Sequence, residues 1–361
     1  MRQSRGPDQR TVLTAFGTIS ITRRHFGCPN CGESQYVVDP LLGIEGYLSP
    51  RVLRLACRLS GDGSFEIAAQ RLDELCSIPV SGETLRRHCP VVGASIAQWV
   101  RTQPTAVAPF AEAKGEIEVQ TDAGKVNTTT GWRDLKVLAF TKRPLGKPAS
   151  PQEWDTRTLP GPTTRMVFTD IEEIETFRQD WRRWADRLGI GSGAAVTMLG
   201  DGAEWIWNAA EAQLPGCRHV LDVYHALEHI GTASKQLYGE GTDAATRSFE
   251  SGKLKLVADG WKGICEYVGE ELSLGDTLER RAALEELLGY AKNHVGRMCY
   301  RSRLAEGRSI GSGLIEGQVK TLGLRLKARG ARWVERNAEN MAALVGLSHS
   351  TLWETYWTLA T

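Results

Sequence analysis

The feature that most constrains the fold is a series of short apolar runs between residues 116 and 225. These runs cover 117–121, 135–140, 165–169, 194–199 and 219–223. Period-two alternation, or a short apolar run bounded by turn residues, is typical of β-strands. A helical pattern at 171–188 separates the third run from the fourth. Neighbouring strands that are followed by alternating helices and strands predict an α/β protein with a mixed sheet.

Changes in composition along the 361 residues predict several segments around this sheet. Residues 226–306 contain no proline and are expected to form an all-helical insertion between two parts of the sheet core. The expected segments are 1–48 (zinc-ribbon-like), 49–110 (helix-turn-helix and connector), 111–225 (first part of the core), 226–306 (helical insertion) and 307–361 (second part of the core and C-terminal helices).

Overall charge and hydropathy exclude some classes of protein. The net charge is +1 and the mean hydropathy is −0.29, values that argue against a uniformly basic nucleic-acid coat. We find no run of about eighteen apolar residues, so no membrane span is expected. Met1–Arg5 is not followed by an apolar stretch, which predicts no signal peptide and a cytoplasmic location.

Eight cysteines in a chain of this kind are expected to be mostly free thiols. Cys28-Pro29-Asn30-Cys31-Gly32 resembles one knuckle of a zinc ribbon and follows two expected strands, 12–16 and 18–22, around Gly17. A structural zinc site needs four ligands. The residues available to complete it are His25, Cys57, Cys76, His88 and Cys89; a half-site is the alternative.

A helix-turn-helix is predicted between Ser64 and His88. Ser64 is expected to cap a helix at 65–75, residues 78–80 break it, and Ser81 is expected to cap a short helix at 83–88. Arg86, Arg87 and His88 on the second helix are the expected DNA contacts. An ordinary helical hairpin is the alternative, and residues 91–115 read as a connector.

Three separated carboxylates are the candidate catalytic residues. Asp122 and Asp201 each follow an expected strand, and Glu316 lies on an expected helix after Gly311-Ser312-Gly313. Converging at one sheet edge, such residues can bind Mg²⁺ or Mn²⁺, and two such ions support phosphoryl transfer. Each residue also has a structural alternative: Asp122 can start a turn, Asp201 can cap a helix, and Glu316 can pair with Lys320 at the surface.

The helix of Glu316 carries further chemistry. Its apolar stripe is Ile315, Val319, Leu322 and Leu326, and an adjacent face carries Glu316, Lys320, Gly323 and Lys327. Between residues 301 and 340, nine residues are basic and four are acidic. Lys320 and Lys327 are therefore expected to bind phosphate, although a solvated basic surface is the alternative.

Asp222, His225, Glu228 and His229 form a further cluster. His225 and His229 are four residues apart and share a helix face, so that with Asp222 or Glu228 they can hold zinc. A hydrogen-bonded structural network is the alternative interpretation.

Several of these segments together resemble bacterial insertion-sequence transposases of the ISKra type. The resemblance covers nearly the whole chain, and its most specific part is the run from Gly200 to Asn208. The other matching segments are Gly131–Lys136, Asp222–Ala226, Gly311–Glu316, Arg325-Leu326-Lys327 and Arg332-Trp333.

The resemblance implies an RNase H-like core with a DDE triad, interrupted by a helical insertion. The triad falls on Asp122, Asp201 and Glu316, while Asp222 and His225 match a signature that supports the core. The implied partner is DNA, and a homo-oligomer is expected because two element ends must be joined.

Three hypotheses follow from the sequence. The first is a magnesium-dependent DNA transposase that hydrolyses a phosphodiester and transfers a strand. The second is a non-catalytic DNA-binding regulator or domesticated transposase remnant. The third is a structural metal protein that uses Cys28, Cys31, His225 and His229.

Overall fold

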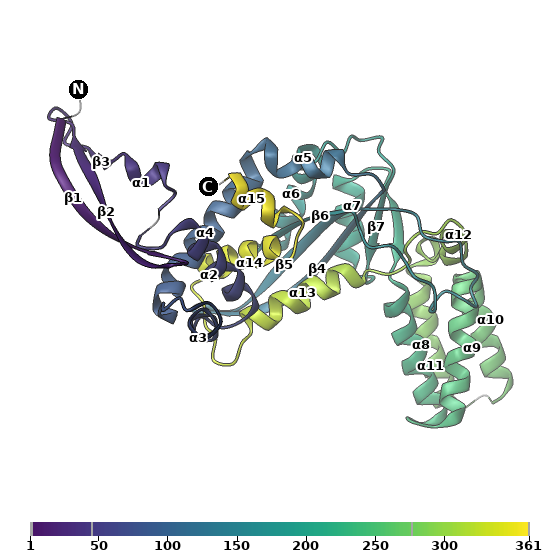
Figure 1. Ribbon diagram of the computed structural model, residues 1–361. Coiled ribbons are helices and arrows are strands. Elements are labelled where there is room, and N and C mark those ends of the chain that lie inside the picture. The colour runs from purple at the N-terminus through teal and green to yellow at the C-terminus, as the bar shows by residue number, and fades with distance from the viewer. Residues whose placement is uncertain (1–2, 45, 276, 360–361) are drawn as a thin grey trace.

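The computed structural model describes residues 3–44, 46–275 and 277–359. A central sheet with helices on both faces lies between a β-arm at the N-terminal end and a helical lobe (Figure 1). Within these ranges the chain is a mixed α/β protein, as predicted. None of the helices described is long and apolar enough to cross a membrane.

The central sheet has five strands in the order β6-β5-β4-β7-β8. Their bounds are β4 (Glu116–Thr128), β5 (Gly131–Arg143), β6 (Thr164–Asp170), β7 (Val196–Gly200) and β8 (Arg218–Leu221). β4 pairs antiparallel with β5 and β5 with β6, whereas β4, β7 and β8 are mutually parallel neighbours. Every predicted strand of this region is confirmed.

The prediction that a strand ends at Asp122 is wrong. β4 continues to Thr128 because β5 pairs with it along its whole length, up to the pair Thr128 and Gly131. Only the parallel partner β7 stops earlier, at Gly200. Asp122 therefore lies within a strand, just beyond the point where β4 is paired on both sides.

Helices cover both faces of the sheet. The covering helices are α6 (Ile174–Arg187), α7 (Glu204–Gln213), α13 (Gly313–Leu326) and α14 (Glu335–Ser348). Adjacent residues of β6 show the division: Phe168 stacks on Trp184 of α6, with ring centroids 3.8 Å apart, whereas Val167 lies against Gly346 of α14. Successive strand residues point to opposite faces, so α6 and α14 lie on opposite sides of the sheet.

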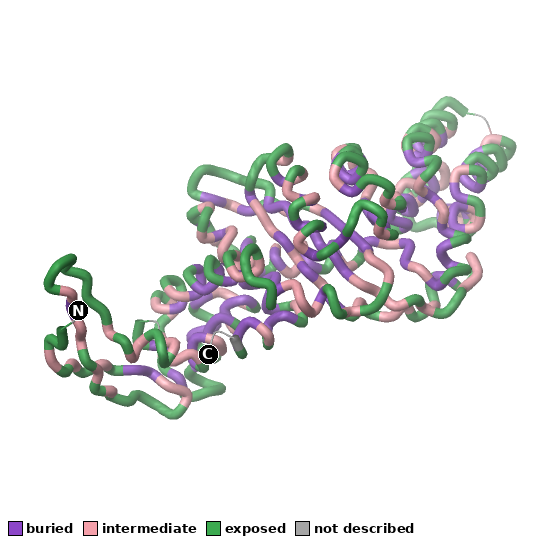
Figure 2. The backbone as a smooth tube through the Cα atoms, turned by 90° about the horizontal axis from the view of Figure 1, so that it is seen from above, coloured by how far each residue is buried: buried purple, intermediate pink, exposed green. Residues whose placement is uncertain are grey.

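The N-terminal arm consists of β1 (Gln3–Thr14), β2 (Gly17–Gly27) and β3 (Ser34–Tyr36). β1 and β2 form the predicted hairpin around Gly17, which has a φ of 109°, but both strands are longer than expected. Most of the arm is exposed (Figure 2). Val12 and Leu13, near the hairpin turn, are buried against the body of the molecule.

Five helices follow the arm: α1 (Val38–Leu41), α2 (Pro50–Asp62), α3 (Phe65–Cys76), α4 (Gly82–Thr102) and α5 (Pro104–Glu112). Both predicted caps are confirmed, because Ser64 accepts from the Ile67 amide and Ser81 from the Thr84 amide, each at 3.2 Å. The connector predicted at 91–115 is wrong. α4 continues through Pro90 and packs closely on α14: a Cβ on Gly93 would lie only 2.0 Å from the Asn340 carbonyl oxygen.

The residues between β8 and α13 are helical and form a lobe beside the sheet (Figure 1). It contains α8 (Val223–Tyr238), α9 (Asp243–Asp259), α10 (Trp261–Ser273), α11 (Leu278–Lys292), the 3₁₀ turn η1 (Val295–Arg297) and α12 (Tyr300–Ala305). The chain then returns to the sheet through α13 and ends with α14 and α15 (Leu352–Leu359). The insertion is long in sequence but enters and leaves the sheet at neighbouring places, since the Val223 amide bonds the Ile310 carbonyl at 3.0 Å.

Candidate carboxylate site

Strand register brings Asp122 and Asp201 together. In the parallel pairing of β4 and β7, Gln120 lies opposite Leu199, so a continuation by two residues places Asp122 level with Asp201. In the pairing of β7 and β8, Gly200 lies opposite Leu221, so Asp222 continues the same row. Neighbouring strands lie about 4.8 Å apart, and residues level with each other point to the same face. Three aspartates thus follow one line across the sheet.

The turn after β7 holds Asp201. Its Oδ1 accepts a hydrogen bond from the Ala203 amide at 2.9 Å, and α7 begins at the next residue. The N-cap of α7 is Ala203, so the alternative that Asp201 is the cap residue itself is wrong. Gly202 adopts a φ of 103°, which favours glycine and allows this tight turn.

Asp222 links the N-termini of α8 and α13. It is fully buried, and its Oδ1 accepts from the amides of Tyr224 at 2.6 Å and His225 at 3.1 Å, which caps α8. Its Oδ2 accepts from both the amide and the hydroxyl of Ser312, the residue before α13. These hydrogen bonds to both carboxylate oxygens fix the position of the Asp222 side chain. Asp222 therefore links the beginning of the insertion to its end.

Glu316 lies in the first turn of α13, over the central strand. The Ile315 amide donates to Oε1 of Gln120 at 3.1 Å, and a Cβ on Gly124 would touch Val319 at 3.2 Å. Gln120, Asp122 and Gly124 share one face of β4, so α13 runs along the face that carries Asp122. The Ser312 hydroxyl, which donates to Asp222, lies 3.4 Å from Oε1 of Glu316. These contacts place α13 over the face of β4 that carries Asp122, and the charge of Asp122 acts on Glu316.

Burial and neighbouring charges affect two of these groups. Burial raises the pKa of Asp122, and the charge of Asp201 reinforces the shift. Burial also raises the pKa of Glu316, and the charges of Asp222 and then Asp122 add to it. His225 acts in the opposite direction on both. Asp201 acts on Asp122, and Asp222 and Asp122 act on Glu316, so these carboxylates are close enough to interact electrostatically.

The side chains are not arranged as a preformed metal centre. Across residues 3–44, 46–275 and 277–359, no group of three or more His, Cys, Asp or Glu side chains is placed to hold a metal ion. Magnesium, however, is commonly held by one or two carboxylates together with water and substrate phosphate. Asp122 and Asp201 supply ligands of that class.

The third sequence hypothesis, a metal site that combines the cysteine knuckle with two histidines of α8, is wrong. Cys28 and Cys31 lie between β2 and β3 on the arm, whereas α8 is in the lobe at the opposite end (Figure 1). His225 lies 3.4 Å from Glu228, and His229 stacks on Tyr290 with ring centroids 3.6 Å apart. The two histidines therefore have separate surroundings.

The cysteine knuckle has the turn expected of it. The Gly32 amide donates to the Cys28 carbonyl at 3.1 Å, and the Cys28 amide donates to the Glu33 carbonyl at 2.8 Å. The residues considered as completing ligands lie elsewhere or are occupied: Cys57 and Cys89 are buried in the helical core, Cys76 ends α3, His25 stacks on Tyr36, and His88 lies against Gly46. Zinc binding at Cys28 and Cys31 stays a prediction.

The predicted DNA contacts on α4 divide into two groups. Arg86 and Arg87 are exposed, and both pair with Glu83, at 2.6 and 2.8 Å. His88 is only half-buried, but a Cβ on Gly46 would lie 2.5 Å from its ring, so this histidine packs against the preceding loop. The two arginines are therefore accessible at the surface, whereas His88 is partly covered by the preceding loop.

The basic segment 301–340 is only partly a surface feature. Lys320 and Lys327 are exposed on α13, and the predicted apolar stripe packs inward on the sheet. Arg303 and Arg325, however, are buried, with exposures of 1% and 4%. Arg325 bonds the Ser60 carbonyl and lies over the rings of Phe65 and Trp333. Two of the nine basic residues therefore stabilise the interior.

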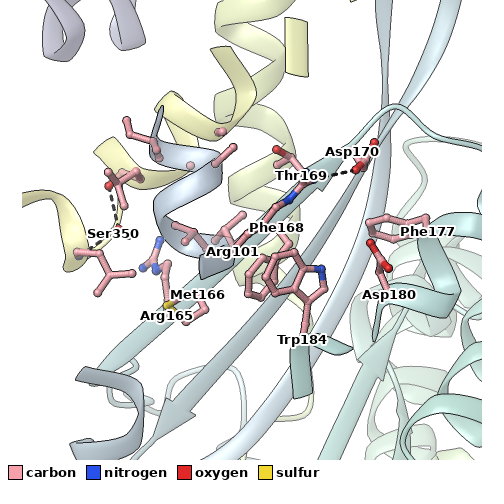
Figure 3. Close-up of a pocket in the computed structure, with 18 residues that line it drawn as sticks. Arg101, Arg165, Met166, Phe168, Thr169, Asp170, Phe177, Asp180, Trp184 and Ser350 are labelled. Atoms are coloured by element: carbon pink, nitrogen blue, oxygen red, sulfur yellow. Dashed lines mark hydrogen bonds and ion pairs between the residues drawn. The ribbon is translucent and has the colours of Figure 1, made fainter. Parts of the chain in front are cut away.

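A pocket at the edge of the sheet lies away from these carboxylates. It is formed by β6 with helices α4, α6 and α14, and it contains Arg101, Asp170 and Trp184 (Figure 3). Burial raises the pKa of Asp170, which lies 3.5 Å from Arg101. Because β5 lies between β6 and β4, this pocket is separate from the row of aspartates.

Sequence reasoning missed Tyr290 and His294, which approach the turn at Gly202 from the end of α11. Tyr290 lies on the last turn of α11 and His294 just after it, and their spacing of four residues was the available signal. Comparison with known proteins adds no assignment: no family model matches this chain, and no curated protein matches it.

Proposed function

We propose that this chain is a DNA transposase that hydrolyses and transfers phosphodiester bonds with the help of divalent metal ions. The observation that carries the proposal is the alignment of Asp122 and Asp201 on neighbouring parallel strands, with Glu316 brought over Asp122 by α13. Negative charges that lie close together are stabilised when a cation binds between them.

An RNase H-like core is the fold that we propose for the sheet and its helices. The strand order supports it: three antiparallel strands come first, and two parallel strands then extend the other side of β4. The helical insertion between β8 and α13 supports it as well, because it interrupts the core between the second and third carboxylates.

In this proposal Asp122 and Asp201 hold Mg²⁺ or Mn²⁺, and Glu316 completes the set when DNA is bound. The metal would polarise the phosphodiester and favour ionisation of the attacking oxygen. Asp222 positions Glu316 through Ser312, while Lys320 and Lys327 bind the DNA backbone. α3 and α4 act as a helix-turn-helix, and Arg86 and Arg87 exchange Glu83 for phosphate. A homo-oligomer would hold two DNA ends.

The direct test is cleavage of labelled duplex DNA that carries the sequences flanking the native gene. Wild type and Asp201→Asn are compared in Mg²⁺, Mn²⁺ and EDTA. We expect metal-dependent nicking that falls at least about a hundredfold in the variant, because a bound metal contributes several kcal/mol to such reactions. The matched control is Asp170→Asn, which removes another half-buried carboxylate at a strand end, two strands away from Asp122.

A second candidate function is a DNA-binding regulator without catalysis. The absence of a preformed three-ligand group among the described residues favours it. It predicts sequence-specific binding that is equal in Mg²⁺ and EDTA, with no nicking in any metal. Nicking by Asp201→Asn at the wild-type rate would exclude the carboxylate mechanism.

A further inference from the structure

The helical insertion reaches the carboxylate row at one place. A Cβ on Gly202 would meet His294 Nε2 at 3.1 Å and the Tyr290 hydroxyl at 3.2 Å. Gly202 follows Asp201 directly, so both polar atoms lie beside the turn that holds this aspartate. They come from the end of α11 and the residues that follow it, about 90 positions away along the chain.

The Tyr290 hydroxyl is buried and has no hydrogen-bond partner among the described residues. Buried hydroxyl groups nearly always have a partner, so an unpartnered one next to a site suggests that its partner arrives with a ligand. The ring itself is held firmly. It stacks on His229 of α8 at 3.6 Å between centroids and packs edge-on to His294 at 4.9 Å. The hydroxyl therefore has a fixed direction before any ligand binds.

His294 presents a donor to the same place. It is 5% exposed, and its Nδ1 lies 3.2 Å from Nη1 of Arg297. A guanidinium can only donate, so Nδ1 is the acceptor and the proton of the neutral ring is on Nε2, the atom that faces Gly202. Burial lowers the pKa of His294 to about 4, an effect to which Arg297 adds. The imidazole is therefore neutral near pH 7.

Tyr290 also keeps its proton. Burial raises the pKa of its hydroxyl, and the charges of Asp201 and Asp222 raise it further. Two uncharged donors, the Tyr290 hydroxyl and His294 Nε2, thus converge beside Asp201. Two such donors suit an oxygen that carries partial negative charge.

We propose that Tyr290 and His294 together bind a non-bridging oxygen of the phosphodiester held at Asp201. This inference rests on the proposed function, since it takes the ligand to be the DNA backbone. It makes the insertion part of the reaction site: the sheet supplies the carboxylates, and α11 supplies neutral donors from the other side.

The test is Tyr290→Phe, with Tyr300→Phe as its matched control. The Tyr300 hydroxyl is also buried without a partner among the described residues, but it is not among the three atoms nearest a Cβ on Gly202, whereas the Tyr290 hydroxyl is. Cleavage in Mg²⁺ is measured on ordinary duplex and on duplexes with an Rp or Sp phosphorothioate at the cleaved position. Thermal unfolding of both variants reports on folding.

We expect Tyr290→Phe to lower kcat by about 10- to 100-fold, as for loss of a hydrogen bond to a charged group, with little change in unfolding temperature. One of the two phosphorothioate isomers should slow cleavage by wild type, because sulfur accepts hydrogen bonds more weakly than oxygen. The same isomer should slow cleavage by Tyr290→Phe much less, because this variant has no hydroxyl to donate. Tyr300→Phe should behave as wild type in every measurement.

The possible failures are distinguishable. If wild type nicks no DNA, the proposed function fails and this inference fails with it. If wild type cleaves but Tyr290→Phe keeps its kcat and the same phosphorothioate effect, the inference alone is wrong. Equal losses in Tyr290→Phe and Tyr300→Phe would also overturn it, because they would indicate a general effect on the lobe.

Discussion

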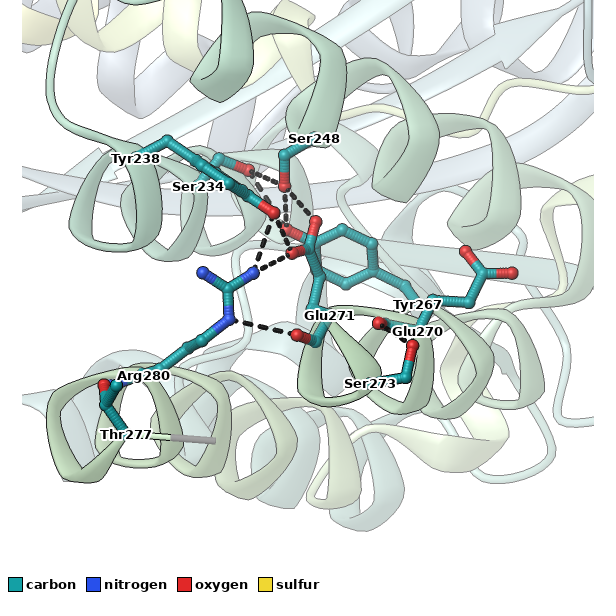
Figure 4. A network of polar contacts seen from close by, with 9 residues as sticks. All are labelled: Ser234, Tyr238, Ser248, Tyr267, Glu270, Glu271, Ser273, Thr277 and Arg280. Carbon is teal, nitrogen blue, oxygen red and sulfur yellow. Dashed lines mark hydrogen bonds and ion pairs between the residues drawn. The ribbon is translucent and has the colours of Figure 1, made fainter. Parts of the chain in front are cut away.

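The five-stranded sheet and the helical insertion have different kinds of interior. In the sheet the large side chains of Leu138, Phe140 and Met198 are fully buried, and the buried Glu118 of β4 is paired with Arg143 of β5 at 2.9 Å. The insertion has polar groups in its interior: Tyr238, Ser248 and Arg280 converge on the carboxylate of Glu271, and Tyr267 bonds Ser234 and Ser248 (Figure 4). An apolar core tolerates changes of similar volume, whereas a polar network depends on every member being present.

The two regions are therefore expected to lose stability through different substitutions. The sheet depends on packing and on strand register, which also align the aspartates. The insertion depends on a few buried hydrogen bonds and close helix contacts, and it must stay rigid for Tyr290 to keep its position. Changes that act on one interior and spare the other therefore test the comparison.

The largest expected effect follows removal of Glu271. The side chain of Glu271 is 8% exposed, and its Oε2 lies 2.6 Å from Nη2 of Arg280. Glu271→Ala leaves Arg280 without its partner and should lower the free energy of unfolding by about 3–5 kcal/mol. Denaturant unfolding measures the loss, and hydrogen exchange should locate it in α8–α11 rather than in the sheet.

Glu270→Ala is the control for that change. Glu270 is the adjacent residue, and its ion pair with Lys255, at 2.9 Å, is at the surface. Its loss should cost less than about 1 kcal/mol. If the two variants lose equal stability, the buried network is not what holds the insertion together.

A smaller effect is expected from helix contact in the same lobe. A Cβ on Gly263 of α10 would lie 1.9 Å from the Lys255 carbonyl of α9, so Gly263→Ala must push the two helices apart. We expect a loss of about 1–3 kcal/mol. Gly289→Ala in α11 should instead stabilise by up to about 1 kcal/mol, because nothing lies within 4 Å of that Cβ and alanine favours helix. Opposite shifts in melting temperature would support this account, and equal shifts would contradict it.

The smallest effect concerns the sheet and depends on pH. The pKa of Asp122 is raised in the folded protein, mainly by burial, so folding favours the protonated form. The free energy of unfolding therefore falls as the pH rises from the pKa of Asp122 in the unfolded chain to its raised pKa in the folded protein. Asp122→Asn should be more stable than wild type at pH 7, by less than about 1 kcal/mol given the partial exposure of the group, and the gain should disappear near pH 3.

Adding Mg²⁺ to the stability measurement tests whether Asp122 is a metal ligand. If Asp122 is a ligand, Mg²⁺ at pH 7 should raise the melting temperature of wild type and leave Asp122→Asn unchanged, since a ligand stabilises the state that binds it. An equal response of both proteins would count against Asp122 as a metal ligand.

Several parts of this arrangement could be predicted from sequence because they depend on local patterns. The apolar runs predicted the strands, and serine caps predicted the starts of α3 and α4. Local patterns gave the wrong end of an element where packing or pairing with a segment far away in the sequence extends it. α4 continues past Pro90 because α14 packs against it, and β4 continues past Asp122 because β5 pairs with it.

The site shows the same division. Asp122, Asp201 and Glu316 were candidates by residue type and position, but no local pattern shows that they meet. Burial also separated residues that look alike in sequence: Lys327 is at the surface, whereas Arg325, two residues before it, is in the core.

By itself, the sequence determined the elements, because hydrophobic periodicity and capping act between residues a few positions apart. Which of their residues lie close together depends on the tertiary structure. Parallel register placed Asp201 level with Asp122, the bond between Asp222 and Ser312 brought α13 to the sheet, and the fold of the insertion placed Tyr290 beside Gly202. Such juxtapositions depend on contacts between residues far apart along the chain, and the spacing of residues in the sequence does not specify them.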